Sequence, residues 1–506
     1  MRKNLNLFIT ALSLCAGLAL PVASSAQEPQ EEKKEHHHYK LIDIGTLGGP
    51  NSGLSGPDLQ TLNNRGTFAP FANTSTPNPN PNCSVAFNNG SPDCFVEHPA
   101  VWHNGVLTDL GVLPGGANGS PSWISANGLI VGYSENGLMD PFTGQPEGIA
   151  VLWAGGKVID LGTLAGGTES LAVAVNSRGQ IAGFSSNDIP DAFSFLSILG
   201  ITPGFPMQTR AFLWQNRVIR DLGTLGGPDA FVGGMNESGQ IFGMSYTNST
   251  PNPTTGLPTQ DPFLWENGKM WDIGNLGGTS GVSLFINNMG QVVGNSNLAG
   301  DQTQHAFIWD KRQGLKDLGV LPGGTFSGAN WINDSGEVVG AGDDAVKMNG
   351  ILWKNGAIVK LDVLPGDCNS EALSINSRGQ IVGHSSPDCV VDGNAVLWEN
   401  GLPPVNLNTL VVPESDVAAV YPVQINDRGE IAAHGFTSSG DGRGVLLIPC
   451  DEDHPGIQGC DYDPVEVGTE ALVRSAHIGT APAAASATKL SPTEMLKRRR
   501  HRFGKP

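Results

Sequence analysis

The stretch Asp160-Leu161-Gly162-Thr163-Leu164-Ala165-Gly166-Gly167 decides the fold, because versions of it recur along most of the chain. Close copies lie at residues 43–49, 109–116, 221–227, 272–278 and 317–324, and weaker copies at residues 360–366 and 406–410. Successive copies start 43 to 66 residues apart. A period of this length is typical of a repeat architecture in which each repeat is one supersecondary unit.

The composition favours short strands and tight turns. The 506 residues include 68 Gly and 35 Pro, and 15 % are charged, against about 25 % in an average soluble protein. The formal net charge of −19 argues against a nucleic-acid partner, because binding phosphates requires clustered Lys and Arg. Beyond the N-terminus, no apolar stretch reaches the roughly 18 residues that a membrane-spanning helix needs, so we predict no membrane span.

Turn signals divide each repeat into two β-hairpins, whose strands we call a to d in chain order. Asn-x-x-Gly turns join strands a and b at residues 176–179, 236–239, 333–336, 376–379 and 426–429. Asn hydrogen-bonds its own backbone in such turns, and Gly adopts a positive φ without steric cost. Asn-Gly dipeptides, a strong hairpin signal, join strands c and d at residues 104–105, 267–268, 355–356 and 400–401. Each repeat is therefore predicted to be a four-stranded unit.

The two ends of the repeat array complement one another. Strand d stands alone at residues 39–45, whereas the last repeat has strand b at residues 430–435, strand c at residues 444–448 and no strand d. Pairing the two would close a ring and cover the strand edges, whereas an open solenoid would need polar caps. We therefore predict an all-β fold over residues 39–449, a closed β-propeller of eight four-stranded blades. Seven blades is the alternative, because the first repeat is the weakest.

A Trp ends strand c in repeat after repeat. The positions are Trp102, Trp153, Trp214, Trp265, Trp309, Trp353 and Trp398. We predict that these indoles form the repeat cores, as large aromatic residues usually do in propellers; the alternative is that they line a ligand tunnel. The Asp that opens each copy of the recurrent stretch is predicted to be a structural hydrogen-bond acceptor rather than a catalytic group.

Both ends of the chain lie outside the array. Residues 1–26 are predicted to be a secretory signal peptide cleaved near Ala26, with Arg2 and Lys3 before an apolar run. Residues 27–38 are polar and predicted to be disordered. Residues 450–466 form an acidic segment, for which calcium binding is an alternative although the spacing fits no known loop. Residues 467–506 are predicted to be a disordered tail with a basic end.

The cysteines that follow the signal peptide form local pairs. These are Cys83 with Cys94, Cys368 with Cys389, and Cys450 with Cys460. An even set in an exported protein is compatible with disulfides. Unpaired thiols and zinc are the alternatives, and zinc is disfavoured because no pair has the ligand spacing of a structural site.

The connections between strands indicate where function would lie. In an up-and-down blade the b–c and d–a connections share one face, and the b–c connections vary widely, over residues 73–98, 134–148, 186–209 and 245–260. Variable loops on a rigid scaffold usually carry recognition. No nucleophile elbow, His-Glu-x-x-His or phosphate-loop motif occurs, so the sequence predicts no catalytic, cofactor-binding or metal-binding residues.

Three phrases recur together in fixed order: Asp-Leu-Gly-x-Leu-Gly-Gly, Ile-Asn-x-x-Gly-Gln-Ile-Val-Gly and Ala-Phe-Leu-Trp. Over residues 39–449 they resemble the HAF family of bacterial extracellular repeats. The chain often has Ala-Phe-Leu-Trp, as at residues 211–214, where the family name implies His-Ala-Phe; His305-Ala306-Phe307 keeps that form. The resemblance implies an exported repeat protein of undefined biochemistry and carries over no catalytic residues.

The sequence therefore predicts a secreted, non-enzymatic scaffold that binds an extracellular glycan or protein through the variable-loop face. The first alternative is a secreted hydrolase or lyase that acts on polysaccharide. The second is a structural component of the cell surface.

Overall fold

The computed structural model describes residues 36–56, 59–80, 83, 94–387, 393–399, 401–411 and 416–465. These residues belong to one of two compact units, Glu35–Pro506; the predicted signal peptide and basic tail lie outside the described residues. In the described part, the helices are two single turns, α1 (Phe195–Ile198) and α2 (Leu407–Leu410). The prediction of an all-β protein is confirmed. Among the described residues, no helix is both long enough and apolar enough to cross a membrane.

Successive strands pair antiparallel in groups of four. The groups are β2 (Gly48–Gly53), β3 (Phe71–Pro77), β4 (Phe95–His103), β5 (Val106–Asp109); β6 (Gly119–Ile124), β7 (Ile130–Met139), β8 (Pro146–Ala154), β9 (Lys157–Gly162); β10 (Ser170–Val175), β11 (Ile181–Pro190), β12 (Met207–Gln215), β13 (Val218–Asp221); β14 (Ala230–Met235), β15 (Ile241–Pro251), β16 (Pro258–Glu266), β17 (Lys269–Asp272); β18 (Gly277–Ile286), β19 (Val292–Leu298), β20 (Gln304–Asp310), β21 (Gly314–Asp317); β22 (Ser327–Ile332), β23 (Val338–Asp343), β24 (Met348–Lys354), β25 (Ala357–Lys360); β26 (Asn369–Ile375), β27 (Ile381–Ser386), β28 (Asn394–Trp398), β29 (Val405–Asn406); and β30 (Val417–Ile425), β31 (Ile431–Thr437), β32 (Gly442–Pro449) with β1 (Tyr39–Asp43).

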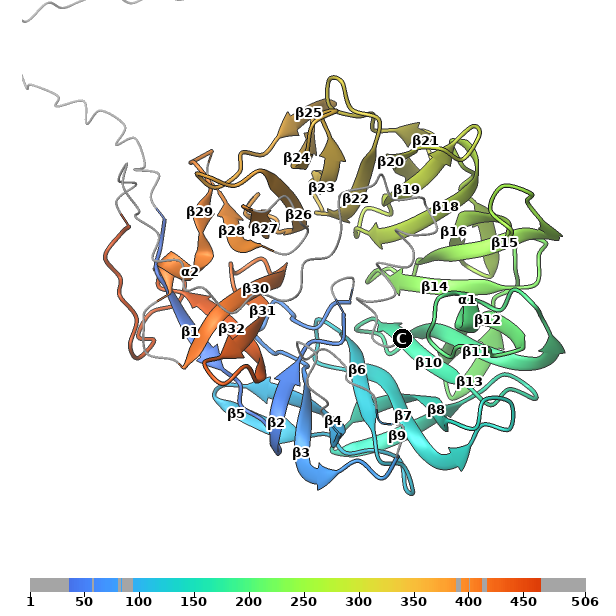
Figure 1. Ribbon diagram of the computed structural model, residues 1–506. Helices are drawn as coiled ribbons and strands as arrows, with labels where there is room; N and C mark the ends of the chain where they lie inside the picture. The colour runs from blue at the N-terminus through green and yellow to red at the C-terminus, as the bar shows by residue number, and fades with distance from the viewer. Residues whose placement is uncertain are drawn as a thin grey trace, which may run out of the picture. The chain divides into compact units, whose positions relative to one another are not determined.

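These groups are arranged as in a propeller. Figure 1 shows them following one another around a common centre, with first strands such as β6, β14 and β22 nearest to it and fourth strands such as β5 and β25 on the outside. A single parallel bridge between Gln260 and Ser280 joins β16 to β18, so the two groups on either side of it form one eight-stranded sheet.

The strand that stands alone in the sequence completes the last group. β1 pairs antiparallel with β32, from Tyr39 opposite Pro449 to Asp43 opposite Val445. In the first group, by contrast, the strand that follows the recurrent stretch is β2. Residues 62–68 form a short hairpin closed by a bridge between Leu62 and Phe68, and Phe68 is also bridged to Trp102 of β4. The backbone N–H groups of Thr61 and Leu62 both donate to Gln424 Oε1 of the last group, at 3.1 Å.

In several a–b turns, the Asn side chain also links its group to the next. Asn333 Oδ1 accepts from Glu337 N at 2.9 Å within the turn, while Asn333 Nδ2 donates to the carbonyl of Asn376 in the next group at 3.0 Å. Asn376 in turn donates to Asn426, and Asn426 donates to Asn63 of the first group. The remaining groups are linked by side chain-to-backbone bonds of the same turns: Asn63 to Ser125, Asn127 to Ser177, Ser177 N to Glu237, Asn236 to Asn287, and Asn287 to Asn333.

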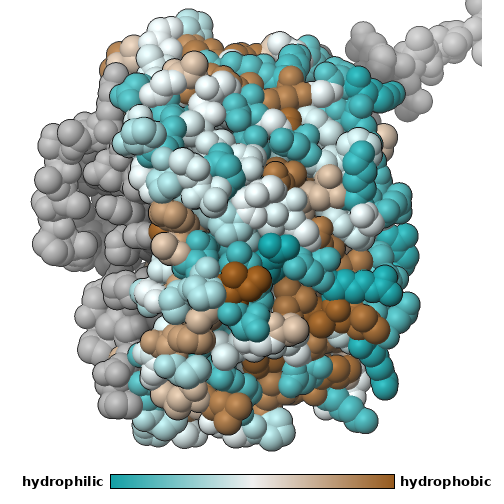
Figure 2. Space-filling model, turned by 90° about the vertical axis from the view of Figure 1, so that its right-hand side faces the viewer, coloured by the Kyte–Doolittle hydropathy of each residue, from teal (hydrophilic) through white to brown (hydrophobic). Residues whose placement is uncertain are grey.

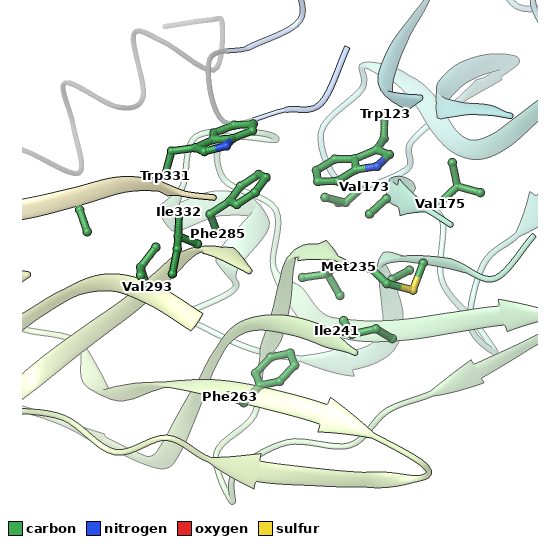
Figure 3. Packing of buried hydrophobic residues seen from close by; sticks show 14 of the residues in the cluster. Trp123, Val173, Val175, Met235, Ile241, Phe263, Phe285, Val293, Trp331 and Ile332 are labelled. Atoms are coloured by element: carbon green, nitrogen blue, oxygen red, sulfur yellow. The ribbon is translucent and has the colours of Figure 1, made fainter. Parts of the chain in front are cut away.

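Aromatic side chains of first strands fill the centre. Figure 3 shows Trp123 of β6, Phe285 of β18 and Trp331 of β22 converging there. The ring centroids of Phe285 and Trp331 are 3.6 Å apart, and those of Trp123 and Phe285 are 6.4 Å apart. Stacked rings of this size bury a large apolar area, so the centre is a packed core.

The Trp residues that end the third strands lie inside their groups. Five of them are buried, namely Trp102, Trp153, Trp309, Trp353 and Trp398, and Trp214 and Trp265 are partly buried against the main core. Three indoles donate Nε1–H to a backbone carbonyl of the preceding group: Trp153 to Gly111, Trp353 to Leu318 and Trp398 to Asp362. The Trp side chains therefore both pack inside their own groups and, in three cases, hydrogen-bond to the preceding group.

Two of the predicted cysteine pairs are disulfides, Cys83–Cys94 and Cys450–Cys460. Cys368 is also disulfide-bonded, and its predicted partner Cys389 lies outside the described residues. Disulfides persist in oxidising compartments, so these bonds are compatible with an extracellular protein.

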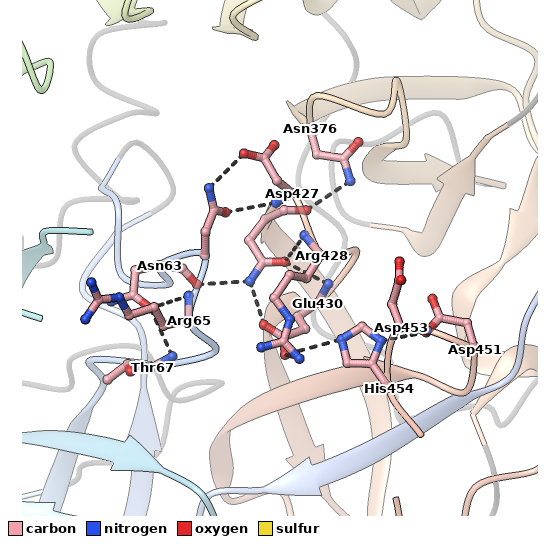
Figure 4. A network of polar contacts seen from close by, with 12 residues as sticks. Asn63, Arg65, Thr67, Asn376, Asp427, Arg428, Glu430, Asp451, Asp453 and His454 are labelled. Atoms are coloured by element: carbon pink, nitrogen blue, oxygen red, sulfur yellow. Dashed lines mark hydrogen bonds and ion pairs between the residues drawn. The ribbon is translucent and has the colours of Figure 1, made fainter. Parts of the chain in front are cut away.

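The acidic segment after the array closes over the a–b turn of the last group (Figure 4). Buried His454 contacts Asp451 Oδ1 through Nδ1 at 2.7 Å and lies 3.5 Å from Glu430 Oε1 through Nε2. His36, which we assigned to the disordered segment 27–38, is buried as well, with Nδ1 2.8 Å from Glu399 Oε1. Sequence spacing alone does not reveal these buried His–carboxylate contacts.

We predict that Asn376→Ala lowers the free energy of unfolding by about 2 kcal/mol, because a buried carbonyl of the next group and two turn amides lose their partners. Urea unfolding followed by circular dichroism measures this. Asn355→Gly is the control: Asn355 lies in an exposed hairpin turn with a φ of 53°, which Gly accepts freely, and a comparable loss there would contradict the assignment.

We also predict that the stabilisation contributed by His454 is lost at alkaline pH. Burial alone would lower the pKa of His454, but its contacts with Asp451 and Glu430 outweigh burial and raise it to about 9. Because the folded pKa exceeds the unfolded value, the stabilisation is fully present below about pH 6.5 and is lost as pH rises through about 9. Melting temperatures of His454→Gln and the parent protein should therefore differ at pH 6 and converge by pH 10. The exposed pair His98–Asp109 gives the control variant His98→Gln, whose difference from the parent should be small.

Candidate functional site

The variable b–c connections contact one another. The ring of Phe142, between β7 and β8, lies edge-on to Phe205, between β11 and β12, with centroids 6.0 Å apart. In the longer of these loops, Phe195 of α1 stacks on Tyr246 of β15 at 4.2 Å. The loops of three consecutive groups are therefore packed together on one face, and they carry an unusual set of acidic side chains.

The first acid of this set is Glu169, which directly precedes β10. Its side chain is buried, and Oε2 accepts the N–H of Gly148 in the preceding group at 3.1 Å. Burial raises the pKa of Glu169 to about 8; the Gly148 N–H opposes this rise, and the nearby charges of Asp140 and Glu147 add to it. Glu169 is therefore a carboxylic acid that keeps its proton at neutral pH.

The two acidic neighbours of Glu169 are Asp140, in the loop between β7 and β8, and Glu147, at the start of β8. Asp140 Oδ1 accepts the backbone N–H groups of Phe142 and Thr143, and Oδ2 accepts Thr168 Oγ1 at 2.6 Å. Glu147 is half-buried, and its Oε2 accepts Asn136 Nδ2 at 2.9 Å. Asp140 is thus fully engaged in shaping its loop, whereas Glu147 is only partly buried.

Tyr133 of β7 lies beside these acids. A Cβ added to Gly148 would lie 3.5 Å from the Tyr133 ring and 3.3 Å from Glu169 Oε2, so the Gly allows the ring and the acid to approach each other. Burial, then the charges of Glu97, Glu135 and Glu169, raise the pKa of Tyr133, which leaves its hydroxyl a proton-bearing donor. We call Tyr133, Asp140, Glu147 and Glu169 the carboxyl cluster.

A second buried acid occupies the next junction between groups. Asp229 accepts the N–H groups of Phe195 at 2.7 Å and Thr209 at 3.0 Å. Burial raises its pKa to about 8, the Phe195 N–H opposes the rise, and the charge of Asp191 reinforces it. Oδ2 of Asp191 is buried and has no hydrogen-bond partner.

Glu169 and Asp229 occupy equivalent positions, two residues after the Gly-Gly pair of the recurrent stretch. At this position in other repeats, Asn118 accepts Glu97 N at 3.0 Å and Asn369 accepts Met348 N at 3.1 Å. A neutral amide side chain is therefore sufficient for this hydrogen bond between groups. An acid at the same position adds a titratable proton that the hydrogen bond does not require. The sequence carries this signal, because Glu169 and Asp229 stand where three other repeats have Asn, and it was missed at the sequence level.

Other polar residues of the repeats lie outside the carboxyl cluster. His98 pairs with Asp109 at 2.9 Å, and His103 contacts Thr67 Oγ1 at 3.1 Å. Each Asp of the recurrent stretch accepts the N–H of the Gly two residues later, as Asp160 does from Gly162 at 2.7 Å. Among the residues that the structure describes, no group of His, Cys, Asp and Glu has the arrangement of a metal site.

No protein-family model and no curated protein matches the sequence. Solved structures with a related architecture include Porphyromonas gingivalis dipeptidyl peptidase 4 (10% identity, 76% of this chain and 51% of that chain, TM-score 0.40). They also include a prolyl endopeptidase (11% identity, 80% and 54%, TM-score 0.38) and an ulvan lyase of polysaccharide lyase family PL25 (11% identity, 73% and 94%, TM-score 0.31). The chain spans about half the length of the two peptidases.

These similarities correct the main functional prediction. A non-enzymatic scaffold that binds glycan or protein is contradicted, because the similar structures are named as peptidases and a polysaccharide lyase. At these identities and TM-scores the likeness assigns neither an activity nor a residue. The function proposed below therefore depends on the carboxyl cluster itself.

We predict that the protein loses stability as pH rises because the buried Glu169 must give up its proton. Its folded pKa lies above the unfolded value, so its contribution is fully present below about pH 4.5 and is lost as pH rises through about 8. Glu169→Gln keeps an acceptor for Gly148 but has no proton to lose. Its melting temperature should exceed that of the parent protein at pH 8.5 and match it near pH 4. Exposed Glu452→Gln is the control, and an equal gain in both variants would contradict the assignment.

Proposed function

We propose that the four-stranded groups form a closed propeller of eight blades, and that the chain is an exported protein of the HAF-repeat type with residues 1–26 as its signal peptide. The antiparallel pairing of β1 with β32 and the bond from Asn426 to Asn63 support closure, because both join the last group to the first. The order of the turn-to-turn bonds supports the blade number.

We further propose that this protein hydrolyses an extracellular polysaccharide by general acid–base catalysis at the carboxyl cluster. The observation that carries the proposal is the raised pKa of Glu169, about 8, beside a second carboxylate on the variable-loop face. Glycoside hydrolysis uses two carboxyl groups, one of which must hold a proton at the working pH. Glu169 meets that requirement, and Glu147 offers the accessible carboxylate.

The roles follow from these environments. Glu169 donates its proton to the glycosidic oxygen as the bond from that oxygen to the anomeric carbon breaks. Glu147 accepts a proton from the water whose oxygen adds to the anomeric carbon. The Tyr133 hydroxyl donates a hydrogen bond near the reacting sugar, and Asp140 holds the loop. Exposed Leu138 near the end of β7 and exposed Phe142 in the following loop offer apolar surface to sugar rings.

Hydrolysis fits the cluster better than elimination. A lyase acting on a uronate needs positive charge to neutralise the substrate carboxylate. Within the described part of the chain, no Lys, Arg or His forms an ion pair with Asp140, Glu147 or Glu169. A glycosidic bond between neutral sugars requires no such cation.

We predict that residues 27–506 release reducing ends from at least one member of a panel of bacterial and plant polysaccharides. Glu169→Gln should lower kcat by about a hundredfold or more, because it removes the general acid, with little change in KM. The alkaline limb of the parent's pH profile, near pH 8, should disappear in that variant.

Asp229→Asn is the matched control, because Asp229 occupies the equivalent repeat position outside the carboxyl cluster. This substitution should leave kcat unchanged. Absence of cleavage across the panel, or full activity of Glu169→Gln, would overturn the proposal.

A further inference from the structure

A second surface feature lies on the outer edge of the group β14–β17, away from the carboxyl cluster. Trp271 of β17 is 40 % exposed. Lys269 Nζ lies over its ring, 3.2 Å from the centroid, and Lys311 Nζ lies 5.7 Å from the same centroid. Figure 2 looks onto the side of the molecule that carries β14 to β18, where hydrophilic residues dominate and hydrophobic ones are exposed between them.

The two lysines come from different groups and are positioned by different contacts. Lys269 shares a strand with Trp271 and, two residues away, projects to the same side of the sheet. Lys311 lies in the turn between β20 and β21, where Asp310 Oδ1 accepts Arg312 N at 2.7 Å. Lys311 pairs with Glu266 of β16, which also accepts Gln240 Nε2 at 2.8 Å. The indole and both ammonium groups are therefore brought together by the packing of neighbouring groups.

This arrangement differs from ordinary protection of a strand edge. A lysine on an edge strand blocks unwanted pairing, but that role does not require an exposed indole. At the equivalent position, directly before the first residue of each copy of the recurrent stretch, other groups have Thr108, Ile159, Arg220, Lys316 and Val359. An exposed Trp with two nearby cations is thus particular to this edge, on a chain whose net charge is −19.

We propose that Trp271, Lys269 and Lys311 form a binding site for an anionic polysaccharide, separate from the carboxyl cluster. The exposed part of the indole packs against the apolar face of a sugar ring, and the two ammonium groups pair with the carboxylate or sulfate of that sugar. Asp272, the next residue, projects to the opposite side of the strand and accepts Gly274 N at 2.7 Å. The site would attach the protein to an acidic extracellular polymer and does not depend on the proposed hydrolysis.

The test is binding of residues 27–506, carrying Glu169→Gln to prevent cleavage, to oligogalacturonate, measured by isothermal titration calorimetry. Neutral dextran oligosaccharides of equal length and dextran sulfate are run in parallel. Trp271→Ala should weaken binding of oligogalacturonate by about tenfold or more, the range of one aromatic and cation contact. Lys269→Gln and Lys311→Gln should each weaken it several-fold and reduce its salt dependence.

Lys360→Gln is the matched control. Lys360 is an exposed lysine paired with Asp344 at 2.7 Å, and its loss should not change binding. Unchanged affinity of Trp271→Ala with an unchanged melting temperature, or equal binding of neutral dextran, would overturn the proposal. Stronger binding of dextran sulfate than of oligogalacturonate would identify sulfate as the preferred group. Because no turnover is measured, the outcome is independent of the hydrolysis proposal.

Discussion

The bond from one Asn turn to the next is the constraint on which the array depends. A four-stranded group has one face on each neighbour, and apolar packing alone would allow neighbours to slide. The Nδ2 group of Asn333 reaches the carbonyl of Asn376 while its Oδ1 satisfies the amides of its own turn. One buried side chain thereby sets both the hairpin and the spacing between groups. Leaving any of these backbone groups unpaired would cost roughly 1–3 kcal/mol.

The Asn hydrogen bonds between a–b turns have a counterpart on the opposite face of the array. There the residue two positions after Gly-Gly accepts an N–H from the third strand of the preceding group, as Asn118 does from Glu97. Substituting an acid preserves the bond, but the acid is buried and must retain its proton. The pKa of Glu169 and that of Asp229 are raised for this reason. A structural position thus becomes a source of protons without any change in backbone, which explains how a repeat fold can acquire chemistry at one junction.

The candidate site was predictable only in its location. Loop length placed function on the b–c face, and the structure gathers Glu169, Asp140 and Glu147 there. Their grouping was not predictable, because Glu147 lies in β8, Asp140 in the loop after β7 and Glu169 just before β10, and no sequence motif relates them. The exposed Trp271 shows the same limit, since Lys311 reaches it from the next group. Proximity between groups depends on packing, which a linear pattern does not encode.

The sequence by itself determined the repeat, the two-hairpin unit and the complementary ends, because local turn chemistry and strand alternation act over a few residues. Asn376 and Gly379 identify a turn regardless of their surroundings. Only the tertiary structure decided that Asn376 also bonds to Asn426, that Trp123 and Phe285 meet at the centre, and that His454 is enclosed by Asp451 and Glu430. Apart from His454 with Asp451, those contacts join residues that are far apart in the sequence. Burial and charge at such contacts, rather than residue type, decide which acids keep their protons.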